Sequence, residues 1–107
     1  MQATEELLDE RAMSKLKWRC RRGLLENDLL IEKFFKRHEA TLTVSQAEGL
    51  NDLMELSDND LLDLLLNRRE PEQLADVSAQ VSASTYAARE VLNLLRAAAT
   101  GLPSAPI

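Results

Sequence analysis

Several residue types that many folds and active sites depend on are scarce in this sequence. Its 107 residues include one cysteine, one histidine, three glycines and three prolines, and aromatic residues make up only 4%. A single cysteine excludes an internal disulfide, and the lack of clustered histidine and cysteine argues against a metal site. The three glycines form neither a phosphate-binding loop nor a dinucleotide-binding fingerprint.

Long apolar runs are also missing. None approaches the roughly 20 residues that a membrane-spanning helix needs. The N-terminal region is acidic, with Glu5, Glu6, Asp9 and Glu10, unlike a signal peptide or an arginine-rich transit peptide. A lone thiol suits a reducing compartment. We therefore expect a cytoplasmic protein that does not insert into a membrane.

The residues that are plentiful favour helices. Leucine and alanine dominate the apolar 45%, whereas β-branched residues are few, which disfavours strands. The length suits one domain. We predict an all-α fold, a small bundle of about five helices formed by residues 1–100, with residues 101–107 as a disordered tail.

Local signals place the helices. A glycine that follows an arginine-rich turn, Gly23, is expected to end the first helix, because glycine tolerates a positive φ. Thr43 with Gln46 forms a capping box, and Ser57 is a strong N-cap. We expect a break near 82–85, with Ser84 or Thr85 capping the last helix. We also expect the leucine-rich fourth helix to be the central, most buried one. The predicted helices span 3–22, 25–39, 44–56, 58–68 and 72–99, the last with that break.

Charge is segregated along the chain. The net charge is −5, which argues against a polyanion-binding protein. Six basic residues nevertheless follow one another without an intervening acid: Arg11, Lys15, Lys17, Arg19, Arg21 and Arg22. This run is either a solvated helix face or a docking surface for an acidic partner. Few aromatic residues and no basic recognition helix argue against nucleic-acid binding.

No catalytic constellation is evident. Nucleophilic catalysis would need a serine or cysteine beside a histidine, and Cys20 and His38 are the only candidates. Cys20 is expected to pack against the bundle, and His38 to lie at a helix end, where a charged imidazole is favourable. Asn27 or Asp28 is expected to cap the second helix. We therefore predict no catalytic residue and no metal ligand.

One stretch resembles a known family. Arg22-Gly23-x-x-Glu26 resembles the signature of the small succinate dehydrogenase assembly factors, the FAD-assembly proteins that bacteria share with mitochondria. Leu53 to Leu62 resembles the second block of that family, and the likeness covers roughly residues 11–75. The flanking residues agree, with Trp18, Arg21 and Asp28 around the motif. The chain departs from the family pattern at Leu64, where a tryptophan is common, at Asn27, where an apolar residue is common, and in its long C-terminal region.

The resemblance implies a function. Members are chaperone-like helical bundles that bind the flavoprotein subunit of succinate dehydrogenase, and often of fumarate reductase, and promote covalent attachment of FAD. Carried over, Arg22, Gly23 and Glu26 form the partner-binding motif, with Trp18, Arg21 and Asp28 contributing. FAD would belong to the partner, with none bound tightly by this chain. We expect a monomer in the bacterial cytoplasm.

Two other interpretations stay open at this point. The first is a generic helical adaptor or toxin-neutralising protein that acts by protein–protein contact. The second is direct FAD binding by this chain, against which the few aromatic residues and the missing phosphate loop argue. A purely structural interpretation also exists for the motif, since Gly23 can end a helix while Arg22 and Glu26 form a surface ion pair.

Overall fold

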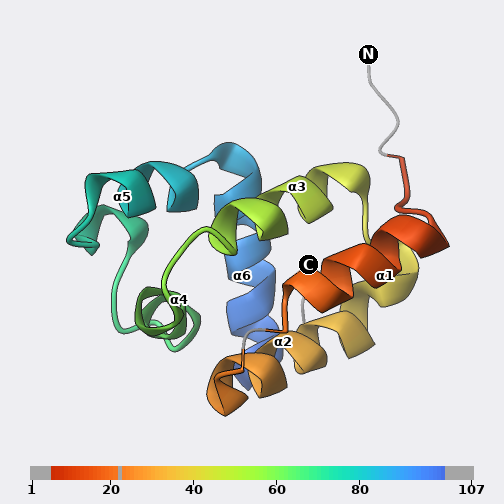
Figure 1. The fold of residues 1–107 in the computed structure, drawn as a ribbon, viewed down its shortest axis with the longest axis horizontal. Coiled ribbons are helices and arrows are strands. Elements are labelled where there is room, and N and C mark those ends of the chain that lie inside the picture. Colours follow the sequence, from red (N-terminus) through yellow and green to blue (C-terminus); the bar gives the residue numbers. More distant parts are fainter. Residues whose placement is uncertain (1–5, 22, 101–107) are drawn as a thin grey trace.

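A computed structural model describes residues 6–21 and 23–100. This part of the chain forms six α-helices and two short 3-10 helices (Figure 1): α1 Glu10–Arg19, α2 Leu25–His38, η1 Glu39–Thr41, α3 Val44–Leu53, α4 Asp58–Leu65, η2 Pro71–Gln73, α5 Val77–Ala83 and α6 Tyr86–Thr100. The all-α prediction is confirmed. The expected count of about five helices is one short, because the last region forms both α5 and α6, separated at the predicted break.

The central element is α6. It runs through the middle of the molecule and packs against α2, α3, α4 and α5 (Figure 1). One face of α6 is buried along its length, at Ala88, Val91, Leu92, Leu95 and Ala98. The prediction that the fourth helix is central is therefore wrong. Its leucines do not all face the core: Leu62 lines a surface groove, and Leu66, just past the helix, is 41% exposed.

Three helix starts follow the predicted capping chemistry. Thr43 accepts a hydrogen bond from the backbone of Gln46 at 3.1 Å, and the Gln46 side chain accepts one from the Thr43 backbone at 3.0 Å. The Ser57 hydroxyl accepts from Asp60 N at 3.2 Å. The Thr85 hydroxyl accepts from Ala88 N at 3.0 Å. These local bonds satisfy amide groups that helix starts leave unpaired.

The first helix is shorter than predicted. It begins at Glu10, with Asp9 as its N-cap, and ends at Arg19. Residues 6–8 are instead extended and run antiparallel to residues 42–44. Leu8 N donates to Leu42 O at 2.9 Å, and Val44 N donates to Glu6 O at 2.8 Å. This pairing with a distant segment overrides the helical propensity of the N-terminal residues. The predictions for residues 3–5 and for the tail, 101–107, lie outside the described residues.

Two contacts lock α6 onto its neighbours. A Cβ atom on Gly49 of α3 would lie 2.2 Å from the carbonyl oxygen of Ala87, so only glycine lets these two helices approach so closely. Arg96 of α6 donates from Nε to Leu64 O at 2.7 Å and from a terminal guanidinium nitrogen to Arg69 O at 2.9 Å. It thereby satisfies carbonyls at and beyond the end of α4.

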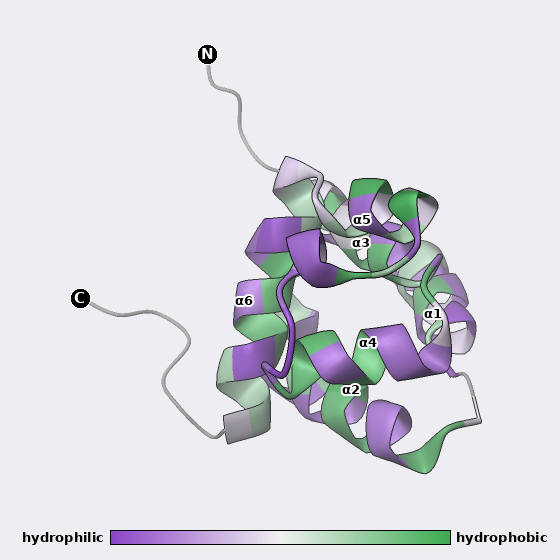
Figure 2. Cartoon of the chain, turned by 90° about the vertical axis from the view of Figure 1, so that its left-hand side faces the viewer, coloured by the Kyte–Doolittle hydropathy of each residue, from purple (hydrophilic) through white to green (hydrophobic). Residues whose placement is uncertain are grey.

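The helices α2 and α4 lie next to each other on the side shown in Figure 2. Both present apolar and polar segments to that side. Within residues 6–21 and 23–100, no helix combines the length and the apolar character that crossing a membrane requires.

Candidate partner-binding site

The junction between α1 and α2 carries the motif. Gly23 has a φ of +91°, a conformation that residues with a Cβ rarely adopt. A Cβ atom there would meet nothing within 4 Å. Backbone conformation, not crowding, therefore favours glycine at this turn. Gly23 was expected to end the first helix, and it lies in the turn that follows it.

The start of α2 has no side-chain cap. Its N-cap residue is Leu24, which makes no capping hydrogen bond. The expectation that Asn27 or Asp28 caps this helix is wrong, because both lie inside it. Glu26 and Asp28 still place negative charge in the first turn, where the helix dipole favours anions. Leu25 and Glu26, in the first turn of α2, are exposed at the surface.

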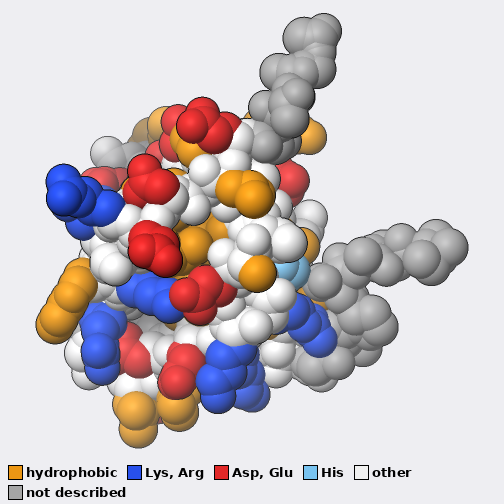
Figure 3. Space-filling model, turned by 90° about the vertical axis from the view of Figure 1, so that its right-hand side faces the viewer, with side chains coloured by type: hydrophobic (Ala, Val, Ile, Leu, Met, Phe, Trp, Pro, Cys, Tyr) orange, Lys and Arg blue, Asp and Glu red, His pale blue; other side chains and the backbone are white. Residues whose placement is uncertain are grey.

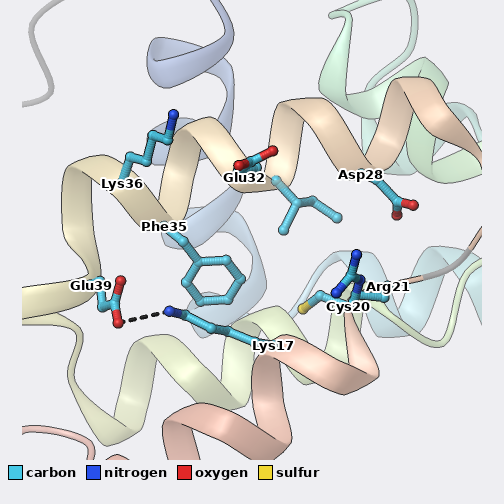
Figure 4. Close-up of a pocket in the computed structure, with 9 residues that line it drawn as sticks. Lys17, Cys20, Arg21, Asp28, Glu32, Phe35, Lys36 and Glu39 are labelled. Carbon is cyan, nitrogen blue, oxygen red and sulfur yellow. Dashed lines mark hydrogen bonds and ion pairs between the residues drawn. The ribbon is translucent and has the colours of Figure 1, made fainter.

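The expected site residues face different sides of α2. Glu26 and Asp28 are two positions apart, which corresponds to about 200° around an α-helix. Asp28 lines a cavity of about 350 Å³ between α1 and α2, together with Arg21 and Cys20 (Figure 4). Glu26 lines a second groove, of about 390 Å³, between α2 and α4. The structure therefore brings Arg21 and Asp28 together and places Glu26 apart from them.

An exposed aromatic residue stands beside the junction. Trp18 is 73% exposed, and the Arg21 guanidinium carbon lies 5.8 Å from the centre of its ring. This geometry is that of a cation–π contact. A large exposed indole backed by a guanidinium is typical of protein interaction sites. Arg22, the first residue of the motif, lies outside the described residues.

Part of the basic run is paired within the molecule. Lys17 forms a 2.7 Å ion pair with Glu39 and lies 5.7 Å from the centre of the Phe35 ring. Arg19 forms a 2.7 Å ion pair with Glu55. These contacts tie α1 to η1 and to the segment after α3. The face shown in Figure 3 accordingly carries acidic and basic side chains close together. The docking-surface interpretation therefore cannot include Lys17 and Arg19 as free cations.

Asn27 is a residue whose role sequence reasoning missed. It is fully buried, and its Nδ2 donates to the carbonyl oxygen of Asp58 at 3.1 Å. Its Oδ1 has no hydrogen-bond partner among the residues described. The contact fastens the first turn of α2 to the first turn of α4. The available signal was its spacing, because Asn27, Ile31 and Phe34 follow the buried helical face.

The two residues considered for catalysis differ in environment. Cys20 is 2% exposed at the end of α1. His38 ends α2, as expected, and its ring centre lies 5.0 Å from that of Phe34. Burial, aided by the charge of Arg37, lowers the pKa of His38 below its usual 6.5, so the expected charged imidazole is not favoured there. The described residues hold no cluster of three or more potential metal ligands.

Comparison with known proteins identifies the family. Residues 14–97 match the family described as the flavinator of succinate dehydrogenase. This chain belongs to that family. The matched region includes the junction motif and also α5 and most of α6, so the likeness extends well past residue 75, where the resemblance ended.

Curated relatives agree with the family match. A protein of Ralstonia nicotianae named FAD assembly factor SdhE is 48% identical over 83% of this chain and 85% of its own length. Proteins with the same name are 39% identical in Legionella pneumophila, over 62% of this chain and 84% of theirs, and 41% identical in Coxiella burnetii, over 57% and 74%. No solved structure matches significantly.

Proposed function

We propose that this chain is an assembly factor that binds the flavoprotein subunit of succinate dehydrogenase and promotes covalent attachment of FAD to it. Membership of the flavinator family carries the proposal. The exposed junction supports it, because Trp18, Leu25 and Glu26 are presented to solvent. Such a surface suits recognition of a protein partner.

The proposed contact residues are Arg22, Gly23 and Glu26, with Trp18, Arg21 and Asp28 flanking them. Arg22 would pair with a carboxylate of the partner, and Glu26 with a cation or a backbone N–H. Gly23 would allow the partner's backbone to approach closely. Since Glu26 and Asp28 line different grooves, the partner would have to surround the N-terminal end of α2 to touch both.

The proposed mechanism is positioning, without chemistry by this chain. The assembly factor would hold the domains of the flavoprotein so that the acceptor histidine of that subunit and its bound FAD are aligned. Fixing two reacting groups in a productive geometry removes much of the entropic barrier to their reaction. FAD belongs to the partner in this proposal. The anchoring of α1 through the Lys17–Glu39 and Arg19–Glu55 pairs would keep the contact surface rigid.

The proposal extends to the oligomeric state, the location and a second client protein. The protein would act as a monomer in the bacterial cytoplasm, and the flavoprotein subunit of fumarate reductase would be a second client. Both flavoproteins would be recognised through the same junction, because the proposed contact requires only a complementary charged surface around the start of α2.

Covalent flavin on the succinate dehydrogenase subunit, read by in-gel fluorescence, tests the function. We expect the signal to fall when the gene is deleted and to return with the wild type but not with Glu26→Ala. The matched control is Glu48→Ala, which removes an exposed glutamate from α3 and should restore the signal fully. Unchanged covalent flavin after deletion would refute the proposal and favour an adaptor with another partner.

Two measurements on the purified protein complete this test. Thermal unfolding of Glu26→Ala should stay within about 1 kcal/mol of the wild type, because Glu26 is exposed and its charge at the start of α2 contributes only a small dipole interaction. A large loss of stability would instead support a purely structural role for the motif. The visible absorbance of the purified wild type reports on flavin, and a bound flavin would refute the assignment of FAD to the partner alone.

A further inference from the structure

A groove between α2 and α4 has an apolar floor. Its lining residues comprise four leucines and four charged residues: Leu29, Leu30, Leu62 and Leu66 with Glu26, Glu32, Lys33 and Lys36. We refer to it as the α2–α4 groove. Two of its leucines are about half exposed to solvent, Leu29 at 50% and Leu66 at 41%. Exposed leucines gathered along one groove are typical of interaction sites.

The apolar surface continues toward the motif. Leu25 is 66% exposed and lies one helical turn before Leu29, on the same side of α2. Glu26, which belongs to the proposed contact motif, also lines the groove. The α2–α4 groove is therefore continuous with the surface through which the proposed function operates.

The charges along the groove have a direction. Glu26 stands near the N-terminal end of α2, and Lys33 follows seven residues later, about 10 Å along the helix axis. Lys36 lies further on, but Glu32 is four residues before it and can offset its charge. The groove thus offers an anion at one end, a cation at the other and leucines between them.

We propose that the α2–α4 groove receives a short amphipathic helix of the flavoprotein subunit. That helix would present apolar side chains to the leucines, a basic residue to Glu26 and an acidic residue to Lys33. The separation of about 10 Å between Glu26 and Lys33 matches about two turns of the partner helix. Over two turns, apolar residues at positions i, i+4 and i+7 of that helix would enter the groove. This inference rests on the proposed function and names the second surface that the flavoprotein contacts.

Affinity variants of the groove test this inference. The binding constant for the purified flavoprotein subunit is measured by calorimetry with Leu29→Ser and with Lys33→Glu. We expect each variant to weaken binding by about tenfold or more. Leu29→Ser removes an apolar contact with the partner helix, and Lys33→Glu places a like charge against its acidic residue. Both changes lie at exposed positions, so circular dichroism should show an unchanged fold.

Matched controls separate the groove from general surface effects. Val81→Ser removes a 64% exposed apolar side chain from α5, outside the groove. Arg37→Glu reverses a charge on α2 at an exposed position that does not line the groove. Both should bind within about twofold of the wild type, because neither alters the groove. Equal weakening by the controls would overturn the inference.

The remaining outcomes are also decisive. If the wild type does not bind the subunit, the proposed function itself fails. If Glu26→Ala weakens binding but Leu29→Ser and Lys33→Glu do not, only the groove inference is overturned. The groove inference alone is also overturned if sedimentation shows that the isolated protein dimerises and that Leu29→Ser abolishes the dimer without affecting subunit binding. A second copy of this chain would then occupy the groove.

Discussion

Replacing Gly49 with alanine should separate α3 from α6. The added Cβ would lie 2.2 Å from the carbonyl oxygen and 2.5 Å from the carbonyl carbon of Ala87, distances that atoms in a folded protein do not reach. The obstacle is backbone, so no side chain can rotate away. Restoring an ordinary van der Waals contact requires one helix to move by more than about 1 Å. The movement would disturb the packing of two helices that each carry fully buried side chains, among them Leu50 of α3 and Val91 of α6.

Two opposing terms set the magnitude. Alanine is favoured over glycine inside a helix by about 1 kcal/mol, whereas overpacking costs about 1–3 kcal/mol or more. A rigid obstacle places the cost at or above the upper end, so we expect a net loss of about 2 kcal/mol or more. For a domain near this size, that lowers the melting temperature by roughly 10 °C.

Thermal unfolding followed by circular dichroism measures this loss. The control is Glu48→Ala, an exposed change at the preceding position of α3, which should shift the melting temperature by only a degree or two. A Gly49→Ala protein as stable as the wild type would refute the close approach of α3 and α6. It would also leave the glycine inside α3 without a structural explanation.

Three further predictions concern single side chains. Arg96→Ala should cost about 2–3 kcal/mol in urea unfolding, because it removes the two hydrogen bonds that the buried side of the guanidinium donates to the carbonyl oxygens of Leu64 and Arg69; a loss below about 0.5 kcal/mol would contradict this. Asn27→Ala should lower stability by about 1–3 kcal/mol, because it removes the hydrogen bond from Nδ2 to the carbonyl oxygen of Asp58 and leaves a cavity at a fully buried position; an unfolding free energy within about 0.5 kcal/mol of the wild type would contradict this. His38 has a pKa below 6.5 in the folded protein, so the unfolded chain takes up the proton first and stability should fall as pH drops below about 6.5; His38→Gln should lose this part of the pH dependence, and an identical pH profile for both proteins would contradict it.

Sequence reasoning succeeded where a short segment decides its own structure. The Thr43–Gln46 capping box, the Ser57 cap and the positive φ of Gly23 all depend on residues within one helical turn. Such interactions can be read from spacing alone. The break before α6 belongs to the same class, because the Thr85 hydroxyl caps the helix that follows it.

The features that sequence reasoning missed depend on distant segments. The extended start of the chain exists because residues 6–8 pair with residues 42–44. The need for Gly49 becomes evident only when Ala87 is placed against it. The prediction that α4 is the most buried helix failed for the same reason. The sequence of α4 does not reveal which of its leucines face α6 and which face a groove.

The candidate site shows the same division. The resemblance supplied the residues of the motif, but their arrangement required the helix boundary. Once α2 begins at Leu25, helix geometry sends Glu26 and Asp28 to opposite sides. The interpretation of the basic run also depended on structure, because Glu39 and Glu55 lie far from Lys17 and Arg19 in sequence yet pair with them.

The placement of the junction suits a surface that must keep its shape when a partner binds. The exposed ion pairs of α1 each contribute at most about 1 kcal/mol to the free energy of unfolding. They nevertheless fix Lys17 and Arg19, the two residues that flank Trp18. On the other side of the turn, Asn27 ties the start of α2 to α4 at the expense of a buried oxygen. A rigid contact surface loses less conformational entropy on association. The two ion pairs of α1 and the buried Asn27 are therefore better explained by partner recognition at this exposed turn than by their contribution to stability.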